Sequence, residues 1–84
     1  MYIYILKSSK FAKTYVGITD DPIRRLMEHN SGDSSFTNKF KPWVLIYKEE
    51  LLNRIEARRR EKYFKSAAGR KKIKKIIYSA IAQW

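Results

Sequence analysis

Five polar side chains in this sequence are of types that take part in acid–base and metal chemistry. Tyr4 and Tyr15 lie in short apolar segments that read as neighbouring strands, so their hydroxyl groups could share one face of a sheet. Arg25 and His29 are four residues apart in a helical pattern and therefore project from the same side of that helix. Glu61 lies in the middle of a later helical segment among basic residues, whereas the other candidate acids have capping or strand-end positions. The chain has no cysteine, so any metal ion would need oxygen or nitrogen ligands.

Each of these residues also has an ordinary structural explanation. Tyrosines in strands usually contribute to packing. Arg25 could be a surface charge, and His29 could interact with the C-terminal end of its helix. Glu61 could form an ion pair with Arg58 or Lys65 along the helix. Taken singly, the structural explanation is favoured for every one of them, and composition with spacing supports only a basic α+β domain.

The strands that would position these residues follow from the hydrophobic pattern. Residues 2–6 and 14–18 are rich in β-branched and aromatic residues, and we expect them to pair as a hairpin. Gly17 within the second strand suggests that another group approaches the backbone closely. Residues 43–47 form a continuous apolar run, which predicts a third strand that is buried on both faces or nearly so.

The helices are indicated by capping signals and apolar stripes. Asp21 followed by Pro22 predicts a helix start, and Gly32 or Asn30 can end that helix in a left-handed conformation. A second helix begins at the Asn53–Glu56 capping box and runs to about residue 66. Gly69 is expected to interrupt it, before a last helix whose apolar stripe contains Ile73, Ile76, Ile77, Ala80, Ile81 and Trp84. The prediction is a single domain over residues 1–84 of the α+β class, with a small, mainly antiparallel three-stranded sheet and the order β-β-α-β-α-α.

The charge of the chain is high and unevenly distributed. The formal net charge is +11, and residues 53–84 carry 11 of the 19 basic residues and only two of the eight acidic residues. A basic half on a small domain indicates a polyanionic partner, because such a charge otherwise costs stability through self-repulsion. The absence of cysteine fits a cytoplasmic protein, and the apolar segment 1–6 is too short for a signal peptide or a membrane span.

The combination of motifs, in this order, resembles the GIY-YIG nuclease superfamily over nearly the whole chain. The resemblance is to its small stand-alone bacterial members, which are related to the N-terminal nuclease module of the excision-repair protein UvrC, and so to DNA repair. The segments that carry it are Tyr2–Tyr4, Tyr15–Gly17, Arg25, His29–Gly32, Pro42–Glu50 and Glu56–Lys65.

This resemblance implies a role for each of the five polar residues. Tyr4 and Tyr15 match the tyrosines of the two name-giving motifs, Arg25 matches the helix arginine, and His29 matches the His/Tyr position that follows it. Glu61 matches the glutamate that binds Mg²⁺ or Mn²⁺. The implied activity is metal-dependent hydrolysis of phosphodiester bonds, with Arg25 stabilising the transition state. Tyr4 and His29 both remain candidates for the general base, because a free tyrosine has a pKa of about 10 and needs help near neutral pH.

The expected substrate is DNA, with RNA as an alternative, and no membrane partner is expected. We expect no appended recognition domain, and therefore structure-directed rather than sequence-directed binding, mainly to the backbone. Phe40, Trp43 and Tyr47 could stack on bases, although core packing is favoured for Trp43 and Tyr47. Residues expected to contact phosphates are Arg24, Arg58, Lys62, Lys65, Arg70 and Lys71.

Two other hypotheses remain open at this point. The chain could be a non-catalytic nucleic-acid-binding module that keeps the fold, and more weakly the last helix could bind anionic membranes. The sequence leaves open whether the protein is a monomer or a homodimer.

Overall fold

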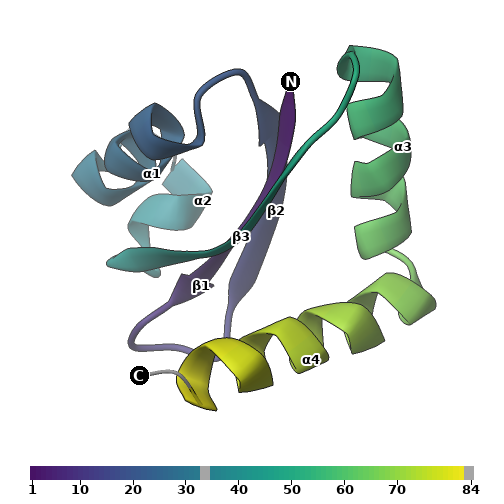
Figure 1. Cartoon of the computed structure of the whole chain (residues 1–84). Coiled ribbons are helices and arrows are strands. Elements are labelled where there is room, and N and C mark those ends of the chain that lie inside the picture. The colour runs from purple at the N-terminus through teal and green to yellow at the C-terminus, as the bar shows by residue number, and fades with distance from the viewer. Residues whose placement is uncertain (33–34, 83–84) are drawn as a thin grey trace.

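A central three-stranded antiparallel sheet organises the molecule. A computed structural model describes residues 1–32 and 35–82, and its strands are β1 (Tyr2–Ser8), β2 (Thr14–Thr19) and β3 (Trp43–Glu50). Their order in the sheet is β2-β1-β3, so β1 is central and β2 lies at an edge (Figure 1). The predicted class, hairpin and element order are confirmed.

The alternation of side chains along β1 creates one core on each face of the sheet. Tyr4 and Leu6 point to the face covered by α1 (Pro22–Ser31) and α2 (Ser35–Asn38), where they pack with Trp43. On this side Tyr15, Leu26, Phe40 and Leu45 complete the packing. This face carries the residues that the sequence singled out for proton chemistry.

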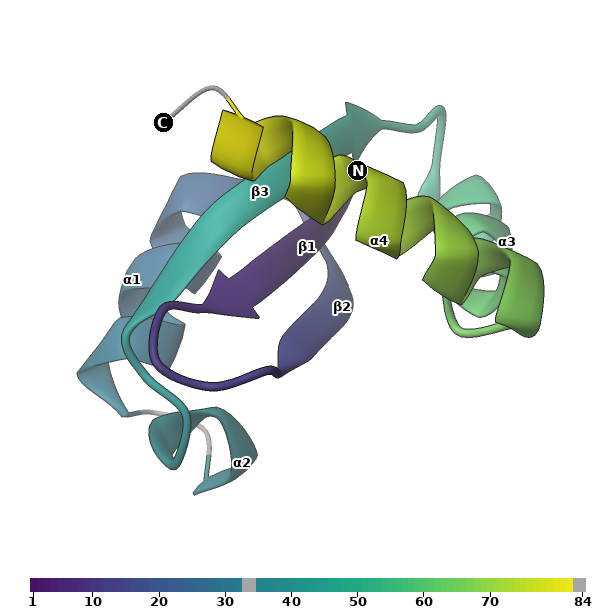
Figure 2. The same cartoon turned by 90° about the horizontal axis from the view of Figure 1, so that it is seen from below.

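The opposite face of the sheet is covered by the two basic helices. Ile3 and Ile5 pack there against Phe64 of α3 (Arg54–Phe64) and Ile73 of α4 (Ala67–Ala82). Figure 2 shows α4 crossing the strands beneath the sheet. Ile73, Ile76 and Ile77 turn towards this core, while the lysines of α4 are exposed: Lys71, Lys72, Lys74 and Lys75.

A β-bulge in β3 adapts the third strand to both cores. Ile5 pairs with Tyr47 but Leu6 pairs with Leu45, so Ile46 is an extra residue on the β3 side. Ile46 and Tyr47 consequently both pack with the α3–α4 face. The strand also continues beyond the predicted segment 43–47, because the polar residues 48–50 keep their backbone pairing with β1.

The helix caps follow the sequence signals closely. The side chain of Asp21 accepts a hydrogen bond from the Arg24 backbone N–H at 3.1 Å, and Pro22 opens α1. Gly32 ends α1 with φ of 90°, the left-handed conformation that favours glycine. Asn53 caps α3 through the Glu56 N–H at 3.0 Å.

The prediction that Gly69 interrupts a helix is wrong. α3 ends at Phe64, and α4 begins at Ala67, so Gly69 lies inside the first turn of α4. A Cβ at this position would lie 2.0 Å from the backbone oxygen of Tyr63 and 2.4 Å from the Phe64 Cα. Gly69 therefore permits the backbone of α4 to pass directly against the end of α3, rather than breaking a helix. Among the predicted stripe residues, Trp84 and the side chain of residue 81 lie outside the described part.

Candidate active site

A buried line of three polar side chains connects the sheet to α1 and α2. The Tyr4 hydroxyl lies 3.0 Å from His29 Nε2, and His29 Nδ1 lies 2.9 Å from Thr37 Oγ1. Exposed fractions are 1% for Tyr4, 1% for His29 and 0% for Thr37. The line thus crosses from the central strand through α1 to α2 and is almost entirely buried.

The position of Arg25 favours one tautomer of His29. Its Nη2 lies 3.4 Å from His29 Nε2, and a guanidinium can only donate hydrogen bonds. The tautomer compatible with this contact has an unprotonated Nε2 and carries its proton on Nδ1. In this tautomer Nδ1–H donates to Thr37 Oγ1, and the Tyr4 hydroxyl donates to Nε2. In this tautomer Nε2 is the atom of His29 that faces the Tyr4 proton.

The environment keeps Tyr4 and His29 neutral near pH 7. Burial raises the pKa of the Tyr4 hydroxyl above 10.0, against the opposing effect of its hydrogen bond with Arg25. Burial lowers the pKa of His29 below 6.5, and the positive charge of Arg25 lowers it further. Arg25 itself donates to Glu28 Oε1 at 2.6 Å, and this hydrogen bond raises its pKa, so its charge is permanent.

Tyr15 stands beside this line on the edge strand, as the shared-face prediction required. Its ring centroid is 4.8 Å from that of His29 and 6.1 Å from that of Tyr4. Gly17 pairs with Tyr4 across the strands, and a Cβ there would lie only 2.6 Å from the Tyr4 hydroxyl oxygen. The close approach expected at Gly17 is confirmed, and the approaching group is the Tyr4 side chain.

Glu61 is not part of this cluster. It lies on α3, which covers the opposite face of the sheet, and one carboxylate oxygen is 3.3 Å from Lys65 Nζ. Within residues 1–32 and 35–82, no hydrogen bond or ion pair joins it to Tyr4, Arg25 or His29. The predicted ion pair with Lys65 is present, and the side chain of Glu61 keeps 21% exposure.

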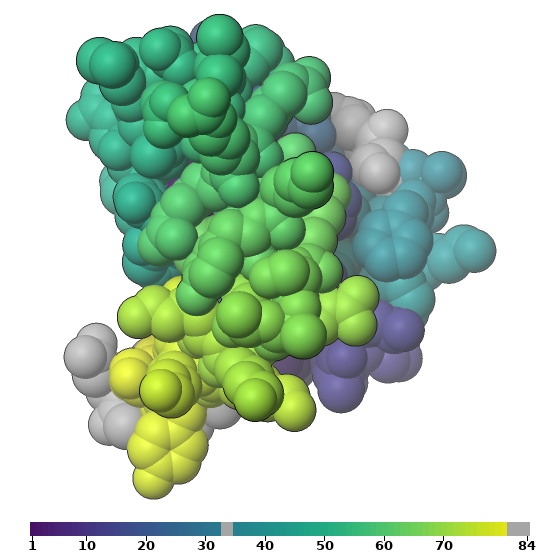
Figure 3. All heavy atoms as spheres, turned by 90° about the vertical axis from the view of Figure 1, so that its right-hand side faces the viewer, coloured from purple at the N-terminus to yellow at the C-terminus, as the bar shows by residue number. Residues whose placement is uncertain are grey.

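A groove around the free edge of β2 links the two sides. It has a volume of about 250 Å³ and is lined by Thr14, Tyr15, Val16, Phe64, Lys65, Arg70 and Ile73. Tyr15 comes from the cluster, whereas Lys65 and Arg70 are two of the predicted phosphate contacts. Figure 3 shows α3 along the front of this side of the molecule, above α4. The groove is where a polyanion could touch both the cluster and the basic helices.

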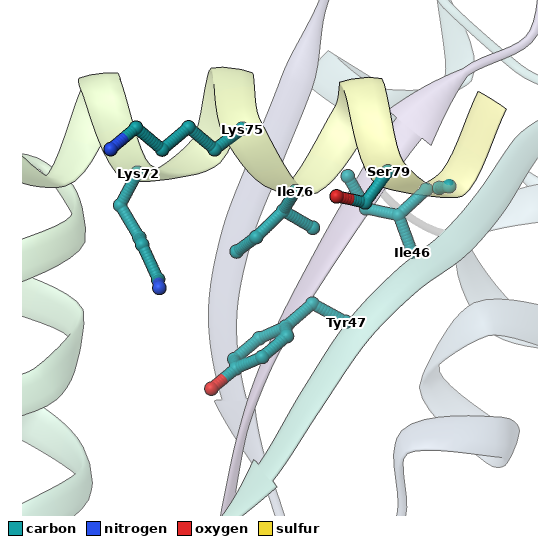
Figure 4. A pocket seen from close by; sticks show the side chains of 7 residues that line it. Ile46, Tyr47, Lys72, Lys75, Ile76 and Ser79 are labelled. Atoms are coloured by element: carbon teal, nitrogen blue, oxygen red, sulfur yellow. The ribbon is translucent and has the colours of Figure 1, made fainter. Parts of the chain in front are cut away.

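The other predicted phosphate contacts are exposed but dispersed. Arg24 pairs with Asp20 at 2.8 Å on α1, away from α3. Arg58 and Lys62 are exposed on α3, and Lys71 is exposed on α4. A second groove of about 320 Å³ lies between α4 and β3, with Lys72 and Lys75 at one end, above Tyr47, and Ile46 at the other end beside Ser79 (Figure 4). This second groove contains none of the five predicted catalytic residues.

Any metal ion held by the described residues would have few protein ligands. No group of three or more His, Asp or Glu side chains that could hold a metal exists within the two described ranges. A single accessible carboxylate such as Glu61 suits Mg²⁺ or Mn²⁺, which bind oxygen and keep several waters when few protein ligands are present. The donor set therefore fits a hydrated ion anchored at one point.

Thr37 and Asn30 contribute to the site in ways the sequence did not indicate. Thr37 holds His29, yet nothing in its spacing from His29 distinguishes it from an ordinary turn residue. Asn30, a candidate cap in the sequence, binds the backbone of Trp43 through its side-chain amide. Oδ1 accepts a hydrogen bond from the Trp43 N–H at 2.6 Å, and Nδ2 donates to the Trp43 carbonyl at 3.1 Å. This clamp fixes the last turn of α1, which carries His29, to the start of β3.

The aromatic residues considered for base stacking divide between core and surface. Trp43 is 3% exposed and donates through Nε1 to the Thr37 carbonyl at 2.8 Å, so it belongs to the core. Tyr47 packs on Phe64, with ring centroids 5.8 Å apart. Phe40 is half-buried beside other exposed rings.

Comparison with known proteins supports a single assignment. The GIY-YIG catalytic domain matches residues 1–75. A UPF0213 protein of Staphylococcus haemolyticus is 36% identical over 76 residues, covering 89% of this chain and 92% of that protein. A UPF0213 protein of Clostridium perfringens is 34% identical over 83 residues, covering 98% of this chain and 88% of that protein. No solved structure matches the chain significantly. Across the two described ranges, no helix is both long and apolar enough to cross a membrane.

Proposed function

Because the chain belongs to the GIY-YIG catalytic-domain family, we propose that it is an endonuclease that hydrolyses phosphodiester bonds of DNA with one divalent metal ion, Mg²⁺ or Mn²⁺. We further propose that residues 1–84 act as one nuclease domain in the cytoplasm, directed by the structure of its substrate rather than by its sequence. A contribution to DNA repair would be consistent with this activity.

The observation that carries the proposal is the Tyr4–His29–Thr37 line with Arg25 beside it. In the tautomer that Arg25 favours, Tyr4 can accept a proton from the attacking water at its hydroxyl oxygen while it gives its own proton to His29 Nε2. His29 then carries the positive charge, with Nδ1–H still held by Thr37. The two candidate bases therefore act as one relay. Tyr4 does not have to be ionised, and His29 does not have to be protonated, before the water attacks.

Arg25 and Glu61 would act on the phosphate from the two sides of β2. Arg25 supplies a permanent planar charge that opposes the negative charge developing on phosphate, and Tyr15 orients the group between them. Glu61 would hold the metal ion at the α3 side. When bound, the ion lowers the pKa of its water and neutralises phosphate charge. The lining of the β2 groove supports this arrangement, because it brings Tyr15, Lys65 and Arg70 together.

Backbone binding would rest on the basic residues already named, Arg24, Arg58, Lys62, Lys65, Arg70 and Lys71. These residues are exposed, so their contact with phosphate should be mainly electrostatic and should weaken as salt increases.

One observation favours the alternative, a non-catalytic nucleic-acid-binding module. Glu61 is engaged with Lys65 and makes no direct contact with the Tyr4–His29 line. A chain that had lost catalysis could keep this ion pair and still bind polyanions through α3 and α4.

A cleavage assay separates the two functions. Purified protein would be incubated with labelled single-stranded, duplex and branched DNA and with RNA, in EDTA, Mg²⁺ or Mn²⁺. We expect metal-dependent cleavage that Glu61→Gln and Tyr4→Phe abolish. Glu56→Gln is the matched control, since Glu56 is a carboxylate on the same helix that pairs with Arg59 at 3.0 Å. Salt-sensitive binding with no cleavage in any metal would establish the binding module instead.

A further inference from the structure

Three phenylalanines form a strip in which two exposed rings, Phe11 and Phe36, flank the half-buried ring of Phe40. Phe11 lies in the β1–β2 loop, Phe36 in α2 and Phe40 just after α2. The ring centroids of Phe11 and Phe40 are 5.5 Å apart, and those of Phe40 and Phe36 are 5.4 Å apart. Phe11 is 48% exposed and Phe36 is 50% exposed, so two large apolar rings face water side by side with a third. Contiguous exposed apolar rings on a small basic domain indicate a binding surface.

The phenylalanine strip begins at the candidate active site. The ring centroid of Phe36 is 6.5 Å from that of Tyr15, which itself contacts the rings of His29 and Tyr4. A flat ligand group on Phe36 would therefore lie next to the residue at the mouth of the β2 groove. The strip and the site form one continuous surface.

Hydrogen bonds to the backbone fix the loop that carries Phe11 and join it to the segment after α2. The Phe11 N–H donates to Ser8 Oγ at 3.0 Å, and Lys7 Nζ donates to the Phe11 carbonyl at 2.7 Å. The loop is joined to the segment after α2 because the Ser9 N–H donates to the Pro42 carbonyl at 3.0 Å. Rings on a backbone fixed in this way lose little entropy when a ligand binds.

The charge around the strip matches a polyanion. Lys13 Nζ lies 5.4 Å from the centroid of Phe40. Lys10, Lys39 and Lys41 are exposed in the same two segments. Within the described residues, none of these four lysines is paired with an acidic side chain. Exposed aromatic faces among unpaired lysines are the features with which proteins hold single-stranded nucleic acid.

We propose that the phenylalanine strip stacks the unpaired bases that flank the phosphate bound at the Tyr4–Arg25 site, so that the favoured DNA contains a single-stranded stretch. In a continuous duplex each base is already stacked and paired, and its face cannot reach Phe36 or Phe11. This inference rests on the proposed function for the position of the phosphate, and it adds the class of DNA that the site selects.

The test is binding measured in EDTA, where cleavage plays no part. The probes are a fluorescein-labelled oligothymidylate, a duplex of equal length and an abasic strand that keeps the phosphates but has no bases. We expect the wild-type protein to bind oligothymidylate more tightly than the abasic strand, and Phe36→Ala or Phe11→Ala to weaken oligothymidylate binding by about 5-fold or more. The same variants should change binding of the abasic strand and the duplex by less than about 2-fold.

Two control variants separate stacking from other effects. Phe36→Leu keeps an apolar side chain of similar size without an aromatic face, and should lose binding as Phe36→Ala does. Tyr78→Ala removes an aromatic ring that is 79% exposed on α4 and should leave all three affinities unchanged. Thermal unfolding would verify that each variant is folded, as expected for half-exposed positions.

The outcomes are distinguishable from those of the cleavage assay. Base-dependent binding that Phe36→Ala removes would support base stacking on the phenylalanine strip even if no metal ion supported cleavage. In that case only the proposed nuclease function would be contradicted. The stacking proposal would be overturned, whatever the cleavage result, if the wild type bound abasic and normal strands with equal affinity. It would also be overturned if Phe36→Ala weakened binding of all three probes equally.

Discussion

Replacing Thr37 with valine tests the proton arrangement at the centre of the candidate site. Valine has nearly the shape of threonine but no hydroxyl group, so Thr37→Val removes the acceptor that lies 2.9 Å from His29 Nδ1 and opens no cavity. The Thr37 carbonyl would still accept from Trp43 Nε1. Among the hydrogen bonds described above, the substitution removes the one between Thr37 Oγ1 and His29, whose exposed fraction is 1%.

The expected cost can be worked out from the two states open to the histidine. If the proton stays on Nδ1, a buried donor is left without its Thr37 acceptor, at about 1–3 kcal/mol. If the proton moves to Nε2, the ring presents N–H to Arg25 Nη2, which is also a donor and lies 3.4 Å away, and it can no longer accept from Tyr4. Either state destabilises the protein, and we expect a loss of about 1–2 kcal/mol, or roughly 4–15 °C in Tm for a domain of this size.

The assay combines thermal unfolding, cleavage and nitrogen NMR of the imidazole. The chain has one histidine, so the ¹⁵N signals of its ring report the tautomer without ambiguity. With the relay interrupted, cleavage should fall by about 10²-fold or more, the scale of general base catalysis. Thr37→Ser is the matched control, because it keeps the hydroxyl group and should retain the Nδ1–H tautomer and most of the activity. If Thr37→Val were as stable and active as the wild type, the relay from Tyr4 to His29 would be refuted.

Three further changes test other parts of the structure. The pKa of His29 is lower in the folded state than the value of 6.5 in the unfolded chain. The unfolding free energy should therefore be highest above pH 6.5 and should decrease as pH falls from 6.5 towards the lowered pKa. Urea unfolding at pH 5 to 8 should show this dependence, and His29→Gln should remove it. Gly69→Ala places a Cβ 2.0 Å from the Tyr63 backbone oxygen and should lower the unfolding free energy by about 2 kcal/mol or more, so an unchanged urea midpoint would contradict the packing argument. Gly17→Ala meets the movable end of Tyr4 at 2.6 Å, so cleavage assays should show a larger loss than thermal unfolding does; a fully active variant would show that the Tyr4 hydroxyl need not stay where it is.

Most of the fold was predictable because its signals are local. The strand segments, the Asp21 and Asn53 caps and the left-handed Gly32 depend on neighbouring residues, and all are confirmed. Gly69 was misjudged because a glycine that ends a helix and one that admits a neighbouring backbone look the same in sequence. Only the crossing of α3 and α4 distinguishes them. Residues 48–50 extend β3 without any apolar signal, since their pairing comes from β1.

The candidate site was predictable in part. The shared face of Tyr4 and Tyr15, and of Arg25 and His29, follows from strand and helix periods, and the contacts in the structure confirm it. The catalytic roles of these residues, and that of Glu61, stay predictions. Thr37 could not have been found from the sequence, because its contact with His29 depends on how the segment after α1 folds back.

The lysines of α4 affect the rate at which a polyanionic partner associates, separately from the affinity with which it binds. Lys71, Lys72, Lys74 and Lys75 are exposed around the helix, and only the stripe with Ile73 faces the sheet. An approaching polyanion is therefore attracted over a wide range of orientations, so a larger fraction of collisions leads to association. Such long-range attraction raises the association rate constant towards the diffusion limit at low ionic strength and is screened beyond about 8–10 Å at physiological salt. Diffuse charge of this kind favours many short encounters, and in the proposed function the geometry of the β2 edge would decide which of them leads to cleavage.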